Sequence, residues 1–201
     1  RVSEISSAGL AGRATGAEVL NRETGERARI SASAVVLCTS PVESIRLLLN
    51  SASAHYPAGL ANSSGLVGRY FMDQLPCIAA GRYPRVKGAA PADGAPPDPF
   101  YGPSGGIFVP RFVGRDSRAA SDFNFQGSIG RYPAGRSGDA RMSFFGFGIM
   151  QPDIDNRVTI DNRVKDAWGI PAPRIRCKMS ETDKATLRRE LDVLEEMVEG
   201  V

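Results

Sequence analysis

The sequence has few of the residues that build metal centres and disulfide frameworks. Its 201 residues include three cysteines and one histidine. The cysteines, Cys38, Cys77 and Cys177, are widely spaced and include no Cys-x-x-Cys pair, so we expect neither a disulfide scaffold nor a structural zinc site. This usage of cysteine is typical of a reducing compartment, and we predict a cytoplasmic protein.

The few candidates for catalysis and metal binding have simpler explanations. The single histidine, His55, has no carboxylate neighbour in sequence, which favours a solvated loop residue over a catalytic base. Four aspartates surround a hairpin-like turn without the spacing of a calcium loop, and for them capping of the turn is favoured: Asp153, Asp155, Asp161 and Asp166. We therefore assign no catalytic residue and no metal ligand.

Long apolar runs and clusters of positive charge are missing as well. No stretch approaches the roughly 20 consecutive apolar residues of a membrane-spanning helix, so we predict no membrane partner. The net charge is +3, but the basic residues are scattered, which argues against nucleic-acid binding. The first residues contain neither a methionine nor the apolar core of a signal peptide, and we expect the chain to be a segment of a larger protein.

Glycine and proline are abundant, with 22 and 14 residues, so many turns are expected and a long helical bundle is not. Residues 16–22 and 27–30 predict two strands of a hairpin. Residues 32–38 end in a continuous apolar run, which predicts a strand covered on both faces in a parallel sheet. No second strand–helix unit follows, so the neighbours of that strand are expected outside the chain.

Two helices are predicted from capping boxes. Ser40 and Glu43 frame Pro41 at the first helical position, and an apolar stripe follows at helical spacing: Val42, Ile45, Leu48 and Leu49. A second box at residues 180–183 precedes the stripe Leu187, Leu191, Leu194 and Val198.

The middle of the chain predicts an antiparallel meander. Short strands separated by turn signals are expected at residues 106–110, 123–129, 142–150 and 157–160. Residues 87–99 form a run of proline, alanine and glycine without periodicity, which is best read as a mobile surface loop, with a lid or an oligomer contact as the alternative.

The order of these pieces resembles the glucose–methanol–choline (GMC) family of flavin oxidoreductases. Residues 34–49 look like that family's strand, small-residue turn and Pro-Arg-Leu-Leu helix, and residues 59–74 look like its Gly-Leu-Val-Gly-Arg segment. Residues 155–161 and 166–171 resemble its Asn-Arg-Val and Asp-x-Gly-x-Pro elements. The resemblance covers almost the whole chain.

The resemblance implies an α+β fold made of two parts. Residues 1–75 would be a segment of an α/β FAD-binding domain, and residues 76–201 would be a substrate domain, an antiparallel sheet with helices on one face. The implied activity is FAD-dependent oxidation of an alcohol, with hydride passing from the hydroxyl carbon to the flavin. The implied partners are a small-molecule alcohol, a sugar or glycoside being favoured, and the remainder of the FAD-binding domain.

The resemblance also implies site residues. Cys38, Thr39 and Ser40 would lie near the FAD, and Asp73 and Gln74 would lie near the junction with the substrate domain. On the substrate side we predict Gln126 and Phe147, which lie on strands able to line a pocket.

The sequence departs from the family pattern in two elements that the family needs for activity. The N-terminal Gly-x-Gly-x-x-Gly motif and the C-terminal segment with the catalytic histidine are both absent, so this chain alone is expected to be inactive. The alternative is a non-catalytic interaction module that keeps the sheet of the substrate domain.

Overall fold

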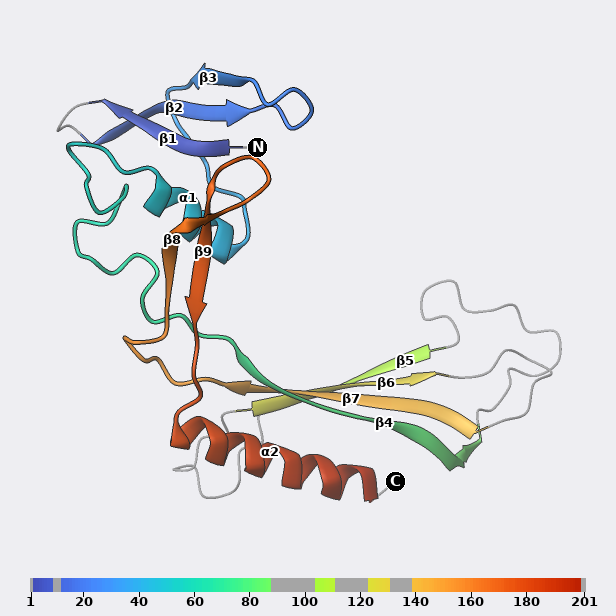
Figure 1. Cartoon of the computed structure of the whole chain (residues 1–201). Coiled ribbons are helices and arrows are strands. Elements are labelled where there is room, and N and C mark those ends of the chain that lie inside the picture. The colour runs from blue at the N-terminus through green and yellow to red at the C-terminus, as the bar shows by residue number, and fades with distance from the viewer. Residues whose placement is uncertain (1, 9–11, 88–103, 111–122, 131–138, 200–201) are drawn as a thin grey trace, which may run out of the picture. The chain divides into compact units, whose positions relative to one another are not determined.

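The structure is a computed structural model that describes residues 2–8, 12–87, 104–110, 123–130 and 139–199. The loop predicted at residues 87–99 therefore lies almost entirely outside the described residues. The fold is α+β, as predicted, with two helices and antiparallel sheets among the described residues (Figure 1). The chain divides into two compact units, Arg1–Met72 with Pro152–Lys178, and Asp73–Gln151 with Met179–Val201.

The first unit begins with a three-stranded antiparallel sheet. Strand β1 (Val2–Ala8) pairs with β2 (Arg13–Leu20), and β2 pairs with β3 (Arg27–Ser31). The predicted hairpin is β2 and β3, and the amide of Asn21 closes its turn by donating to the carbonyl of Glu26 at 2.8 Å. Strand β1 was not predicted.

Helix α1 (Pro41–Asn50) begins where the first capping box predicts it. The Ser40 hydroxyl accepts a hydrogen bond from the Glu43 amide at 3.4 Å. The helix packs against β1 and against an antiparallel hairpin of β8 (Arg157–Lys165) and β9 (Pro171–Arg176). The predicted apolar stripe is half-buried, whereas the most buried side chains of the helix are Arg46 and Leu47.

The predicted buried strand at residues 32–38 is wrong for this structure. Only Ala32 continues the ladder, donating to the carbonyl of Thr15 at 2.9 Å, and residues 34–38 have no regular structure. Val36 is 81% exposed. A strand forms only when a neighbour supplies hydrogen-bond partners, and no described strand lies beside this segment.

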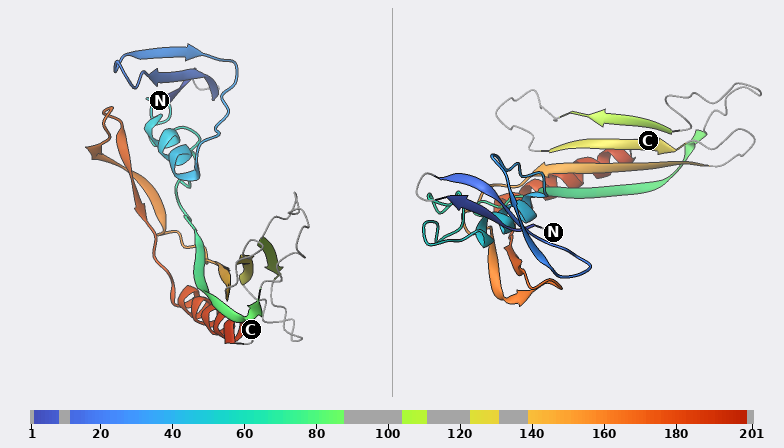
Figure 2. Two further views of the ribbon diagram at one scale, coloured as in Figure 1. Left: turned by 90° about the vertical axis from the view of Figure 1, so that its right-hand side faces the viewer. Right: turned by 90° about the horizontal axis from the view of Figure 1, so that it is seen from above.

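The second unit is built on a four-stranded antiparallel sheet with the order β4-β7-β6-β5. The strands are β4 (Gln74–Lys87), β5 (Ser104–Val109), β6 (Phe123–Gly130) and β7 (Asp139–Ile149). Consecutive strands β5, β6 and β7 form the predicted meander, and β4 adds to the outer side of β7. In Figure 2, as in Figure 1, helix α2 (Glu181–Glu199) runs along one face of the sheet.

The meander does not extend to residues 157–160, which belong to the first unit. There, Val158 of β8 and the residue before the strand, Asn156, bind the loop at residues 68–71 by two backbone hydrogen bonds, from Val158 N to Gly68 O at 2.7 Å and from Phe71 N to Asn156 O at 2.9 Å. Residues 152–178 thus group with the first unit, although the sequence placed them in the region 76–201. The sequence placed a boundary after residue 75, and the chain passes from the first compact unit to the second between Met72 and Asp73.

The core of the second unit lies between the sheet and α2. It contains Cys77, Phe123, Phe125, Met142, Phe144 and Leu194. Leu187 and Val198 of the predicted helical stripe pack against it, but Leu191 is 45% exposed, and Glu190 occupies the buried position instead. Neither described helix is long and apolar enough to cross a membrane.

Candidate functional site

The predicted flavin contacts of the first unit form the turn that leads into α1. Cys38, Thr39 and Ser40 are all exposed. The Thr39 and Ser44 hydroxyls share a hydrogen bond at 2.7 Å, and the Ser40 hydroxyl caps the helix. Two of the three side chains are therefore engaged locally. The group of this turn that fits a cofactor is the exposed, free thiol of Cys38.

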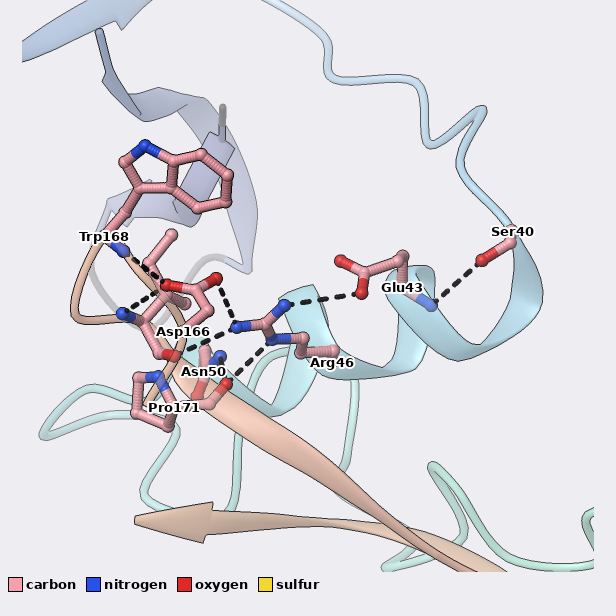
Figure 3. Close-up of polar contacts among 8 residues, drawn as sticks. Ser40, Glu43, Arg46, Asn50, Asp166, Trp168 and Pro171 are labelled. Carbon is pink, nitrogen blue, oxygen red and sulfur yellow. Dashed lines mark hydrogen bonds and ion pairs between the residues drawn. The ribbon is translucent and has the colours of Figure 1, made fainter. Parts of the chain in front are cut away.

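The helix that follows this turn is fastened by Arg46 (Figure 3). Its buried guanidinium donates to the carbonyl of Pro171 at 2.7 Å, to the carbonyl of Ile170 at 3.0 Å and to the carboxylate of Asp166 at 2.8 Å. A further bond reaches Glu43 at 3.3 Å. Each of these acceptors compensates part of the cost of burying the cation, so we assign Arg46 to structure, not to ligand binding.

Asp166 completes this arrangement as a turn cap, as the sequence predicted. Its second carboxylate oxygen accepts hydrogen bonds from the amides of Trp168 at 2.9 Å and Ile170 at 3.1 Å. The turn between β8 and β9 is thereby closed by hydrogen bonds and tied to α1. Sequence reasoning missed the pairing with Arg46, because the two residues are 120 positions apart.

A hollow of about 560 Å³ lies beside this turn in the first unit, and Ile170 and Pro171 belong to its lining. Its lining includes three arginines, Arg27, Arg69 and Arg157, together with Glu4, and none of the predicted cofactor residues. The side chain of Arg27 is paired with Glu18, and Arg69 donates to the carbonyl of Gly65 at 3.0 Å. Two of the three cations are thus already engaged.

The other predicted site residues lie in the second unit. Asp73 is exposed, and its carboxylate accepts a hydrogen bond from the Gln74 amide at 2.8 Å. Gln74 is the exposed first residue of β4 and pairs with Ile149 of β7. Gln126 and Phe147 lie on β6 and β7.

Strand register places Gln126 and Phe147 on the same face of the sheet, which we call the open face. Alternate residues of β7 are buried against α2 (Met142, Phe144, Gly146 and Gly148), so the residues between them point to the opposite side. No other described element of the second unit packs against that side. One row across all four strands consists of Phe108, Gln126, Phe145 and Ile78.

The next row of the open face contains Asn124, Phe147 and Pro76. Asn124 is half-buried, and its amide oxygen is a buried atom without a hydrogen-bond partner among the described residues. An unpaired buried acceptor costs roughly 1–3 kcal/mol, so natural sequences retain few of them. Sequence reasoning missed Asn124, Phe108, Phe145 and Ile78, whose positions follow from the alternation along each strand combined with the register.

The chemistry of these two rows is that of a binding surface. Two carboxamides, Gln126 and Asn124, alternate on one strand among large apolar side chains, and Ile78 and Phe108 are each 62% exposed. An amide both donates and accepts, which matches a hydroxyl group, and the apolar side chains match an aliphatic carbon skeleton. The two rows contain no ionisable side chain, so they supply no general base.

The chain is 36% identical over 200 residues to 2-methyl-1,2-propanediol dehydrogenase of Mycolicibacterium austroafricanum. The match covers 90% of this chain and 36% of that protein, so the chain spans about a third of the length of this relative. No protein-family model matches the chain.

Proposed function

We propose that this chain is part of a flavin-dependent oxidoreductase of the GMC family that oxidises the CH–OH group of a small alcohol. The observation that carries the proposal is the 36% identity over 200 residues with a protein named as a diol dehydrogenase. Because the match covers 90% of the chain, it extends over both compact units. Four segments that resemble GMC motifs, and that follow one another in the order found in that family, support the same assignment: residues 34–49, 59–74, 155–161 and 166–171.

In this proposal the turn at Cys38, Thr39 and Ser40 contacts the FAD, and Asp73 and Gln74 stay the other cofactor residues that the resemblance implies. When bound, FAD supplies the hydride acceptor that oxidation of an alcohol requires. The exposed Cys38 thiol fits such a contact, since the Thr39 and Ser40 hydroxyls are engaged within the turn and helix. The general base comes from outside this chain, which alone is inactive.

The open face of the second unit binds the alcohol in this proposal. Gln126 and Asn124 hydrogen-bond its hydroxyl groups, and Phe145 and Phe147 contact its carbon atoms. Two carboxamides can form hydrogen bonds with only a few hydroxyl groups of a ligand, and the side chains around them are large and apolar. We therefore favour a short aliphatic alcohol or 1,2-diol as the substrate. A sugar or glycoside, which the resemblance suggested, is the second candidate.

The test uses the intact protein that contains this chain. Native mass spectrometry is expected to detect an FAD-sized adduct, and propane-1,2-diol is expected to be oxidised with a higher kcat/KM than a methyl glycoside. Gln126→Leu is expected to raise KM for the diol about tenfold, the loss of one hydrogen bond to a bound hydroxyl. Gln151→Leu is the matched control, because Gln151 is also an exposed glutamine of the second unit.

Two outcomes contradict parts of this proposal. A protein without flavin that oxidises neither compound contradicts the enzyme assignment and favours the non-catalytic interaction module, for which the exposed apolar side chains of the open face are the specific support. Normal diol oxidation in Gln126→Leu contradicts the placement of the substrate on the open face and leaves the activity itself in place.

A further inference from the structure

A carboxyl group is buried under the open face, on the other side of the sheet. Glu190 of α2 is fully buried, with 0% of its surface exposed. Its two oxygens lie against the backbone of β7, where a Cβ added to Gly146 would lie 2.3 Å from Oε1 and one added to Gly148 would lie 2.8 Å from Oε2. The glycines of β7 thus provide the space that the carboxyl group fills.

Among the residues that the structure describes, the groups around Glu190 offer no compensating charge. Neither carboxyl oxygen has a partner with hydrogen-bonding geometry among the described residues. From β4, the thiol of Cys77 lies beside the carboxyl group against Gly146, and from β6 the ring of Phe125 reaches the same glycine. On α2 itself, the buried acid Asp183 is already bound by Gln151 and Ser180. An ionised carboxylate in such a place is far more costly than a neutral one.

We propose that Glu190 is a proton-linked positioning residue of the second unit. Its neutral carboxyl group fills the space against Gly146 and Gly148 beside the Cys77 thiol, and so sets the position of β7 over α2. Loss of its proton to solvent places an uncompensated charge in this core, which loosens α2 from the sheet. The inference concerns the protonation and packing of this chain and does not depend on the proposed enzyme activity.

The same strand connects Glu190 to the open face. Along β7, Phe145 and Phe147 alternate with Gly146 and Gly148, so the two aromatic rings and the carboxyl group lie on opposite sides of one segment of backbone. A displacement of β7 by the charged carboxylate therefore also moves Phe145 and Phe147. Binding on the open face is expected to be weaker at a pH at which Glu190 is ionised.

The titration of the two acids in this core agrees with this geometry. Burial raises the pKa of Glu190 from 4.5 to about 7, although the Cys77 thiol opposes the shift. Burial and the neighbouring Glu190 raise the pKa of the Cys77 thiol from 9.0 to about 12. With a pKa of about 7, the neutral fraction of Glu190 falls from about 90% at pH 6 to about 10% at pH 8.

Infrared spectroscopy of the intact protein tests the inference directly. The C=O stretching band of a protonated carboxyl group is expected in the difference spectrum between the wild type and Glu190→Gln, roughly tenfold stronger at pH 6 than at pH 8. Glu195→Gln, an exposed glutamate on the same helix, is the control and is expected to give no such band at either pH. Cys77→Ala is expected to keep the band and shift its frequency, because the thiol lies beside the carboxyl group.

Absence of the protonated band from the Glu190 difference spectrum at pH 6 would overturn the inference, as would a band of equal strength at both pH values. If Glu190→Gln does not fold, the C=O band of the protonated carboxyl group is followed against pH in the wild type and in Cys77→Ala. The inference is then overturned if the band has the same frequency in both proteins, or if its intensity does not fall between pH 6 and pH 8. None of these readouts requires flavin or an alcohol. Failure of the proposed function and failure of this inference are therefore distinguishable.

Discussion

The guanidinium of Arg46 on α1 binds the carboxylate of Asp166 in the turn between β8 and β9, with 2.8 Å between Nη2 and Oδ2. The same guanidinium donates to the carbonyls of Ile170 and Pro171, so one side chain holds the whole turn. This contact joins residues 120 positions apart. It fixes the helix that follows Cys38, Thr39 and Ser40 within the first unit.

Replacing Arg46 by alanine is expected to lower the free energy of unfolding by about 3 kcal/mol, because it leaves Asp166 and two carbonyls without their shared donor. Arg46→Lys is expected to recover only part of this loss, since an ammonium group cannot reproduce the planar fork. The measurement is guanidinium-induced unfolding. Arg176→Ala, an exposed arginine of β9, is the control, and equal losses in Arg46→Ala and Arg176→Ala would contradict the structural role.

The second helix start gives a prediction for acidic pH. The Asp183 carboxylate accepts hydrogen bonds from the amides of Gln151 and Ser180 and from the Ser180 hydroxyl, at 2.7, 2.7 and 2.8 Å. Burial raises its pKa, but these hydrogen bonds outweigh burial and hold the pKa below its usual value of 3.8. The stabilisation is therefore present above pH 3.8 and lost as the pH falls through the lower pKa of the folded state.

Asp183→Asn is expected to cost about 1–2 kcal/mol at pH 7, and the difference from the wild type is expected to shrink below pH 3. The free energy of unfolding measured at both pH values checks this. Asp192→Asn, an exposed residue of the same helix, is expected to change it little. A loss in Asp183→Asn that stays constant at acidic pH would show that the charge of Asp183 is not what stabilises the helix start.

Short sequence patterns were enough to predict those elements whose formation depends on residues close to one another in the sequence. Both capping boxes, at Ser40 and at Ser180, predicted the helix starts, and the turn signals between residues 106–110, 123–129 and 142–150 predicted short strands. Residues 32–38 carry the composition of a strand, but strand structure requires hydrogen bonds from a neighbour. The composition of a segment does not show whether a neighbouring strand is present to supply those hydrogen bonds.

The candidate site was less predictable because it depends on register and burial. Gln126 and Phe147 were chosen as residues on strands, but their neighbours Asn124 and Phe145 follow only from the pairing of β6 with β7. Glu190 was overlooked because a hydrophobic pattern counts glutamate as polar and places Leu191 in the core. The glycines of β7 make room for a carboxyl group there, and that space exists only in the packed structure.

The space left by Gly146 is itself testable. A Cβ at this position would lie 2.3 Å from Glu190 Oε1, 2.5 Å from the sulfur of Cys77 and 2.9 Å from the ring of Phe125. Gly146→Ala is therefore expected to lower the free energy of unfolding by about 2 kcal/mol through overpacking. Gly106→Ala is the control, because the nearest atom to its added Cβ is 3.9 Å away, and it is expected to change stability by less than about 0.5 kcal/mol. Equal effects of the two substitutions would contradict the close packing at Gly146.

The burial of Glu190 predicts how the free energy of unfolding changes with pH near neutrality. Its pKa in the folded protein, about 7, lies above the usual value of 4.5, so the folded state holds the proton more tightly than the unfolded state. Its contribution to stability is then fully present below pH 4.5 and is lost as the pH rises through 7. The rise of the pKa from 4.5 to about 7 corresponds to a loss of up to about 3 kcal/mol by pH 8.

Glu190→Gln removes this titration while keeping the shape of the neutral side chain. Its free energy of unfolding is expected to be close to that of the wild type at pH 5 and about 2–3 kcal/mol higher at pH 8, because the amide carries no charge at either pH. Urea-induced unfolding at half-unit steps of pH checks this, with Glu195→Gln expected to follow the wild type. If the wild type and Glu190→Gln fall in parallel from pH 5 to pH 8, then the pH dependence arises from other groups, and the neutral Glu190 carboxyl group is not what holds α2 against β7.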